Sequence, residues 1–191
     1  MNRTLLTLAA AALILPASGF AQQPTPAARK NDQQQRIANG VQSGQLTAGE
    51  TKRLETREAG INRETQRDRA ANDGKLTAQE RQQVNRQQNR VSKSIYTDKH
   101  NASTAHFGNN EVGQRRENQQ DRIANGIRSG SMTAGEASRT EGREQRINRS
   151  VARDRAANGG KLTGQERRNI NRRQNGASRQ IYRQKHNAAR R

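Results

Sequence analysis

The heptapeptide Gly44-Gln45-Leu46-Thr47-Ala48-Gly49-Glu50 occurs in four versions, the others lying at residues 74–80, 130–136 and 160–166. In each version a threonine is followed three residues later by a glutamate. This spacing is typical of a capping box, in which the threonine hydroxyl accepts a hydrogen bond from a first-turn amide and the glutamate accepts one from the threonine amide. The motifs therefore predict four helix starts. The expected cap residues are Thr47, Thr77, Thr133 and Thr163.

The four motifs belong to a tandem duplication, because residues 36–102 align without a gap onto residues 122–188 and are identical at most positions. In the first copy, helix-compatible sequence runs from Thr47 to about Ala71 and from Thr77 to about Lys99, and a shorter helix is expected around residues 32–42. We therefore expect an all-α fold of two tandem three-helix units, each a short helix plus a long helical hairpin.

Each predicted long helix has only a narrow apolar stripe, so the core should be thin. The stripes of the first copy consist of Leu54 and Ile61 in one helix and of Val84, Val91 and Ile95 in the other. The expected organisation is a signal peptide at 1–21, a flexible linker at 22–31, helical repeats at 32–102 and 119–188 with a linker at 103–118 between them, and a basic tail at 189–191.

The first residues have the composition of an export signal. A short positive opening with Arg3 is followed by an apolar run from Leu5 to Leu15, and small residues at Gly19 and Ala21 suit a signal peptidase. The apolar run is too short to cross a bilayer, which needs about 20 residues. We expect cleavage after about Ala21 and a periplasmic or secreted protein without a transmembrane anchor.

The chain is strongly basic and has no cysteine. It has 36 Lys and Arg against 17 Asp and Glu, a formal net charge of +19. The absence of cysteine excludes disulfides, thiolate metal sites and cysteine nucleophiles. The charge favours an anionic polymer, namely extracellular nucleic acid, lipopolysaccharide or acidic polysaccharide, or else a protein partner. The alternative is a highly soluble surface that has no partner.

Arginine-rich helical stretches at residues 143–155 and 167–191 are the candidate anion-binding surface. The candidate residues are Arg143, Arg146, Arg149, Arg153, Arg167, Arg168, Arg172, Arg173 and Arg179. Aromatic platforms for stacking bases are scarce, with two Phe, two Tyr and no Trp in the whole chain. Any binding should therefore depend on charge and be independent of sequence.

The repeated motif also resembles a degenerate EF-hand loop, with Gly74 at the sixth position and Glu80 at the twelfth. Arg69 then occupies the first position, where a calcium ligand is needed. A cap explains the motif without metal, so we expect no cofactor and keep calcium binding as the alternative function. Its candidate ligands are Asn39, Ser43, Glu50, Asp73, Glu80, Asn125, Ser129, Glu136 and Glu166.

Catalytic signatures are missing from the sequence: there is no nucleophile motif, phosphate-binding loop or HExxH zinc motif. We therefore expect an exported, non-enzymatic protein with a binding or a structural role. Each copy ends with a tyrosine and a histidine four residues apart, Tyr96 with His100 and Tyr182 with His186. Such pairs share one helix face, and their role is open at this point.

The pattern that runs from Arg36 through Ser43-Gly44 and Gly74-Lys75-Leu76-Thr77 to Ile95-Tyr96 and Lys99-His100-Asn101 resembles a recurrent type of small exported bacterial protein with no assigned activity. The resemblance covers both copies. It implies export and helical repeats, and it assigns no functional residue.

Overall fold

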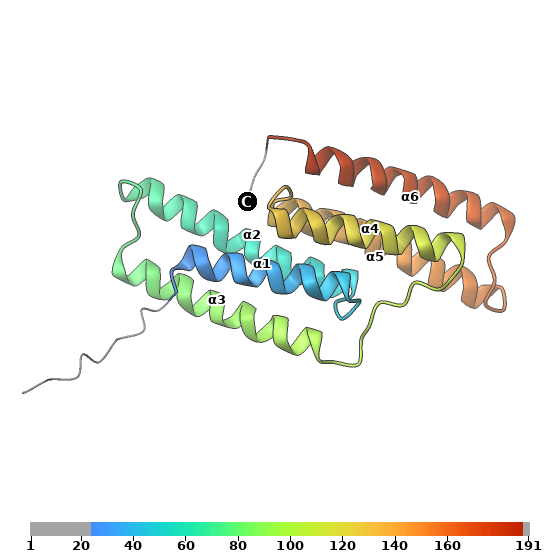
Figure 1. Ribbon diagram of the computed structural model, residues 1–191, viewed down its shortest axis with the longest axis horizontal. Helices are drawn as coiled ribbons and strands as arrows, with labels where there is room; N and C mark the ends of the chain where they lie inside the picture. The colour runs from blue at the N-terminus through green and yellow to red at the C-terminus, as the bar shows by residue number, and fades with distance from the viewer. Residues whose placement is uncertain (1–23, 189–191) are drawn as a thin grey trace, which may run out of the picture.

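The computed structural model describes residues 24–188, which form six α-helices (Figure 1). The helices are α1 (Pro26–Gln42), α2 (Ala48–Ala71), α3 (Ala78–Lys99), α4 (Glu111–Ser129), α5 (Ala134–Ala157) and α6 (Gly164–Lys185). The predicted all-α fold is confirmed. Over the described range, no helix combines the length and the apolar character needed to cross a membrane. The predicted signal peptide and basic tail lie outside the described residues.

All four predicted capping boxes are present, at the starts of α2, α3, α5 and α6. At the first of them, the Thr47 amide donates to Glu50 Oε2 at 2.9 Å and the Glu50 amide donates to Thr47 Oγ1 at 3.4 Å. The first glycine of each motif has a left-handed backbone, which suits a residue without a Cβ. These residues are Gly44, Gly74, Gly130 and Gly160, with φ of 71°, 82°, 71° and 86°.

The leading helix of each repeat begins earlier than predicted, so the predicted linkers at 22–31 and 103–118 are wrong where they overlap α1 and α4. Pro26 is the first residue of α1, where its missing amide costs no helical hydrogen bond, and Thr25 caps this end. Asn110 caps α4 by accepting from the Gly113 amide at 3.1 Å. Both helices therefore start at ordinary capping residues inside segments that look like loops.

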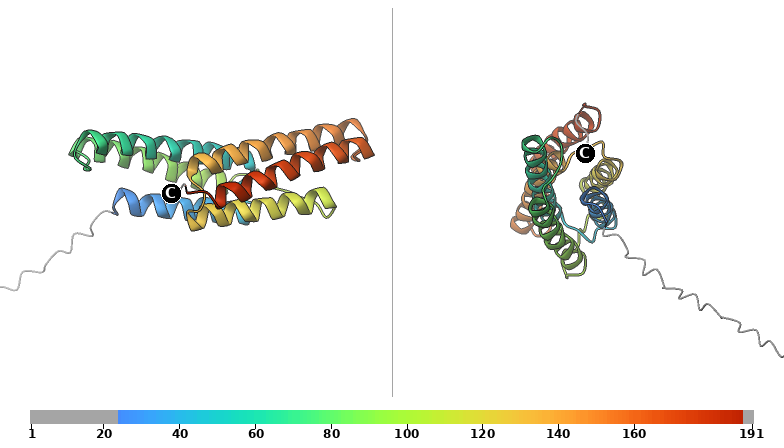
Figure 2. Two further views of the ribbon diagram at one scale, coloured as in Figure 1. Left: turned by 90° about the horizontal axis from the view of Figure 1, so that it is seen from above. Right: turned by 90° about the vertical axis from the view of Figure 1, so that its left-hand side faces the viewer.

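The molecule is elongated, because the α2–α3 and α5–α6 hairpins extend towards opposite ends (Figure 2). Within each repeat the leading helix packs on its own hairpin, α1 on α2 and α3, and α4 on α5 and α6. The most extensive helix contact, however, joins α2 to α5, and the next joins α1 to α4. The two repeats are therefore held together by an interface larger than the contacts inside either repeat.

The hydrophobic core is continuous from one repeat to the other. One cluster combines Ile37, Val41 and Leu54 of the first repeat with Ile123 and Ile127 of the second. A smaller cluster lies within α4, α5 and α6. The predicted apolar stripe is buried, since Leu54, Ile61, Val84, Val91 and Ile95 all belong to the first cluster. The division into two separate folding units stays a prediction.

Candidate anion-binding groove

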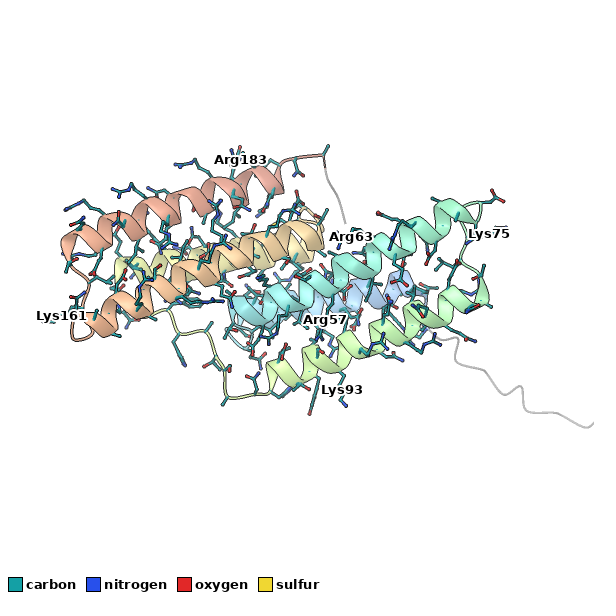
Figure 3. All side chains as sticks on the ribbon, turned by 180° about the vertical axis from the view of Figure 1, so that it is seen from behind. Arg57, Arg63, Lys75, Lys93, Lys161 and Arg183 are labelled. Atoms are coloured by element: carbon teal, nitrogen blue, oxygen red, sulfur yellow. The ribbon has the colours of Figure 1, made fainter. Side chains whose placement is uncertain are left out.

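A groove of about 550 Å³ runs between α5 and α6 and is lined mainly by arginines. Arg143, Arg146 and Arg153 come from α5, and Arg172 and Arg173 come from α6. Figure 3 shows this hairpin from behind, with Lys161 at its tip and Arg183 on α6. Five of the nine candidate arginines therefore line one depression. Arg149, Arg167, Arg168 and Arg179 are exposed but do not line it.

Helical periodicity explains why these arginines gather. Residues three or four apart share a helix face, so Arg143, Arg146 and Arg153 lie along one side of α5. Beneath them, Ile147 and Ile170 are both 1% exposed and pack α5 against α6. The buried isoleucines fix the distance between the helices, and the arginines flank the contact from both sides.

The groove retains a large excess of positive charge after its internal contacts are counted. Arg173 Nη1 donates to the Ser150 hydroxyl at 2.5 Å, and Arg172 donates to the Asn169 side-chain oxygen, so both bond to neutral acceptors. Arg153 pairs with Asp154 at 3.4 Å, which is the one ion pair that lines the groove within residues 24–188. The other four arginines that line the groove have no ion pair of this kind with another groove-lining residue.

A second groove, of about 1320 Å³, lies between α2 and α3 and was not predicted from the sequence. Its basic residues are Arg57, Arg63, Arg67, Arg90 and Lys93, and it also contains Glu64 and Asp98. The duplication offered a signal for it, because Arg57 and Arg67 align with the candidate residues Arg143 and Arg153 at an offset of 86 residues. Acidic residues are mixed with the basic ones in this stretch, so the sequence analysis did not select it as a candidate anion-binding surface.

Corresponding positions of the two grooves differ in charge. Gln87 Nε2 donates to Glu64 Oε2 at 2.7 Å in the first repeat, and at the same place in the second repeat Arg173 donates to Ser150. The first repeat thus has a carboxylate and an amide where the second has a hydroxyl and a guanidinium. Asp98 is likewise replaced by Gln184. The α5–α6 groove is therefore the more positive of two grooves built on one plan.

The candidate calcium ligands have other roles in the structure. Glu50 Oε1 accepts from Asn101 Nδ2 at 2.8 Å, while its other oxygen caps α2. Glu136 is held in the same way, by Asn187 at 2.6 Å and by the Thr133 amide at 2.9 Å. Both carboxylates tie a helix start to the end of the hairpin in the same repeat.

The glutamates of the other two motifs are also caps. Glu80 accepts from the Thr77 amide at 2.7 Å and Glu166 from the Thr163 amide at 2.8 Å. These backbone hydrogen bonds hold the pKa of both carboxyl groups below the ordinary value. Asn72 donates to Glu80 as well, at 3.0 Å.

The remaining candidate ligands do not converge on a site. Asn39 and Asn125 both accept from Arg128, at 3.1 and 3.0 Å, and Ser43 and Ser129 donate to backbone carbonyls of their own turns. Asp73 occupies a turn with a φ of 48°. Across residues 24–188, no group of three or more His, Asp or Glu side chains is arranged to hold a metal ion.

Four buried glutamates form a feature that the sequence did not predict. Glu55 and Glu58 of α2 and their equivalents Glu141 and Glu144 of α5 are each at most 1% exposed. Gln34 donates to both oxygens of Glu55, at 3.2 and 3.1 Å, and Gln120 donates to Glu141 at 3.2 Å. Charged residues are usually exposed, so the sequence gives no reason to expect these four glutamates in the interior.

Burial changes the ionisation of these carboxyl groups. It raises the pKa of Glu58 from 4.5 to about 7, against the lowering effect of Lys30. It raises the pKa of Glu144 to about 7 against Arg116 and Arg143. The pKa of Glu141 is raised well above the ordinary value by burial and by its neighbour Glu144. Positive residues of α1 and α4 therefore face buried acids of α2 and α5.

The tyrosine–histidine pairs are stacked on the protein surface. The ring centroids of Tyr96 and His100, and of Tyr182 and His186, are 4.2 Å apart, and each histidine Nδ1 lies 2.7 Å from the carbonyl oxygen of its tyrosine. The two tyrosines are 62% and 59% exposed. Neither pair lines the grooves described above.

Comparison of the chain with models of protein families, with curated proteins and with solved structures found no match.

Proposed function

We propose that the protein is a non-enzymatic binding protein that holds a segment of an anionic polymer in the arginine-lined groove between α5 and α6. The supporting observation is the convergence of Arg143, Arg146, Arg153, Arg172 and Arg173 on one depression that contains a single carboxylate, Asp154. The predicted export signal would place this activity in the periplasm or outside the cell.

The chemistry of the groove suits phosphate, sulfate or carboxylate groups carried on a chain. A guanidinium presents planar paired donors that match such oxyanions, and it stays charged at any physiological pH. Arginines crowded in one groove repel one another, so an incoming anion relieves that repulsion as well as forming new bonds. Part of the binding free energy comes from release of counterions, and affinity should therefore fall steeply with salt.

The test measures binding of a heparin oligosaccharide to the mature chain by titration calorimetry over a series of salt concentrations. The groove variant combines Arg143→Gln, Arg172→Gln and Arg173→Gln. Its matched control combines Arg149→Gln, Arg167→Gln and Arg168→Gln, which removes the same charge from exposed positions outside the groove.

We expect the groove variant to lose at least tenfold in affinity and to show a weaker dependence on salt, while the control loses much less. Equal losses in both variants would mean that overall charge, and not the groove, attracts the polymer. Binding that requires calcium and disappears in Glu50→Gln and Glu136→Gln variants would favour the calcium-binding alternative instead.

A further inference from the structure

The two grooves open on the same face of the molecule. On α2, Glu55 and Glu58 face α1, whereas Arg57 and Arg67 line the groove; at 100° per residue these two sets lie on roughly opposite sides of the helix. The second repeat is built in the same way. Figure 3 shows this face, with the α2–α3 and α5–α6 hairpins towards the viewer and α1 and α4 behind them.

The grooves meet where the two repeats pack. Along the α2–α5 contact, Gly49 lies against Gln145, Thr56 bonds to Ser138 at 2.7 Å, and Ala59 lies against Gly135, so the helices are antiparallel. These contacts centre on Leu54 and Thr140, which are equivalent residues of the two repeats. The grooves therefore extend from a common centre in opposite directions.

A recess of about 370 Å³ continues the α5–α6 groove towards this centre. It shares Arg143 and Arg146 with that groove and reaches Lys52 of α2, so positive side chains extend across the junction. Arg67 and Arg153 mark the two far ends. Each lies about 13 residues from the centre, or about 20 Å at 1.5 Å per residue, which gives a path of about 40 Å.

The path contains no aromatic side chain among the residues that line it. The exposed tyrosines are stacked on histidines elsewhere, and Phe107 lies under Arg116, whose guanidinium is 5.4 Å from the ring centroid. Proteins that bind single-stranded nucleic acid combine a positive groove with rings on which bases stack. A path with charge and no rings suits a chain that carries anions but no bases.

We propose that the two grooves and the recess between them form one continuous track that binds a single chain of a linear acidic polysaccharide along its length. This inference rests on the proposed function and adds the ligand class, the number of chains bound and a minimum chain length. A chain long enough for only one groove should bind weakly, and each protein should hold two such chains, one in each groove. A longer chain should engage both grooves at once, which raises its affinity because the second groove is then bound at a high effective concentration.

The test uses heparin oligosaccharides of two sizes, about 20 Å and about 40 Å long when extended, with stoichiometry measured by native mass spectrometry and affinity by calorimetry. We expect two short chains per protein, but one long chain per protein with at least tenfold tighter binding. Two long chains per protein, or no gain in affinity with length, would overturn the single track.

A variant of the α2–α3 groove, Arg57→Gln with Arg63→Gln and Arg67→Gln, isolates the contribution of that groove. It should bind one short chain instead of two, and should bind the long chain only as tightly as the short one. Helix content and melting temperature establish that it is folded. Unchanged affinity for the long chain would overturn the track while leaving the α5–α6 groove, and the proposed function, intact.

An oligothymidylate with the same number of charges tests the ligand class. It should bind no more tightly than the polysaccharide, because the track offers its bases no stacking partner. Tighter binding of the oligothymidylate would overturn the choice of polysaccharide. Failure of the native protein to bind even the short oligosaccharide would instead contradict the proposed function itself.

Discussion

At the scale of single residues, the buried acids have the clearest physical consequence. A carboxyl group whose pKa is raised on folding binds protons more tightly in the folded state than in the unfolded chain. Between the two pKa values the folded state therefore holds more protons, and the free energy of unfolding falls as pH rises. Glu58 and Glu144 both titrate near 7 when folded, against 4.5 otherwise.

We expect the protein to be most stable in mildly acidic solution and to lose stability from about pH 5 to about pH 8. Glu58→Gln removes one titrating group. Over that pH range, the free energy of unfolding of this variant should therefore fall by roughly 3 kcal/mol less than that of the native protein. Glu144→Gln should behave in the same way. Urea denaturation at several pH values measures the effect, and Glu117→Gln at an exposed position is the control. A free energy of unfolding that rises towards pH 8 would contradict the assignment.

Burial of these acids could not be predicted because it depends on how the repeats pack. Glu55 and Glu58 occur in a helix rich in exposed charged residues, and no local pattern separates them from Glu64, which lines a groove. The clustering of arginines in the α5–α6 groove was predictable in part, since their density along α5 and α6 is visible in the sequence. Which of them face each other across the hairpin depends on the contact between Ile147 and Ile170.

At the scale of helices, local chemistry determines most of the secondary structure. The four capping boxes located the starts of α2, α3, α5 and α6 from the sequence, because each cap is a short-range interaction between residues three apart. The starts of α1 and α4 were missed because Pro26 and Gly113 are common in loops. In the folded protein Pro26 begins α1 and Gly113 lies in the first turn of α4.

The first turn of α4 has no room for a side chain at position 113 unless the backbone before it shifts. A Cβ there would lie 2.1 Å from the carbonyl oxygens of both Phe107 and Gly108, and these backbone atoms cannot move aside without displacing the loop. Gly60 of α2 is the matched control, because a Cβ there meets nothing within 4 Å.

We expect Gly113→Ala to lower the melting temperature and the free energy of unfolding, by an amount in the range of about 1–3 kcal/mol typical of overpacking. Gly60→Ala should instead raise stability by up to about 1 kcal/mol, since alanine favours the helix. Thermal melts followed by circular dichroism compare the two. A neutral Gly113→Ala would show that the loop before α4 is more adaptable than its close contacts indicate.

At the scale of the whole molecule, the two repeats share one core. Ile37 and Val41 of α1 and Ile123 and Ile127 of α4 belong to one cluster, and all four are at most 1% exposed. The sequence alone is equally compatible with a separate core inside each repeat, because the same side chains could pack against their own hairpin or against the other repeat. The contact between repeats was therefore beyond sequence-based prediction.

A shared core predicts cooperative unfolding of both repeats. Ile123→Ala removes a fully buried side chain of α4 from the cluster that spans the repeats and should cost about 2–5 kcal/mol. We expect the native protein and this variant each to unfold in a single denaturant transition, with the whole transition shifted in the variant. Two separate transitions, of which only one moves, would establish the repeats as independent folding units.

The packing of α2 on α5 has a consequence for how such a protein arises. Gly49 lies against Gln145, and the equivalent residues Gly135 and Ala59 lie against each other in the same way. Arg128 of α4 donates to its own counterpart, Gln42 of α1. Self-complementary contacts of this kind are those of a symmetric homodimer. Joining two protomers in one polypeptide makes their association independent of concentration. It also frees each half to mutate alone, and so the two grooves could come to differ in charge, with Glu64 and Gln87 in the α2–α3 groove and Ser150 and Arg173 at the same positions of the α5–α6 groove.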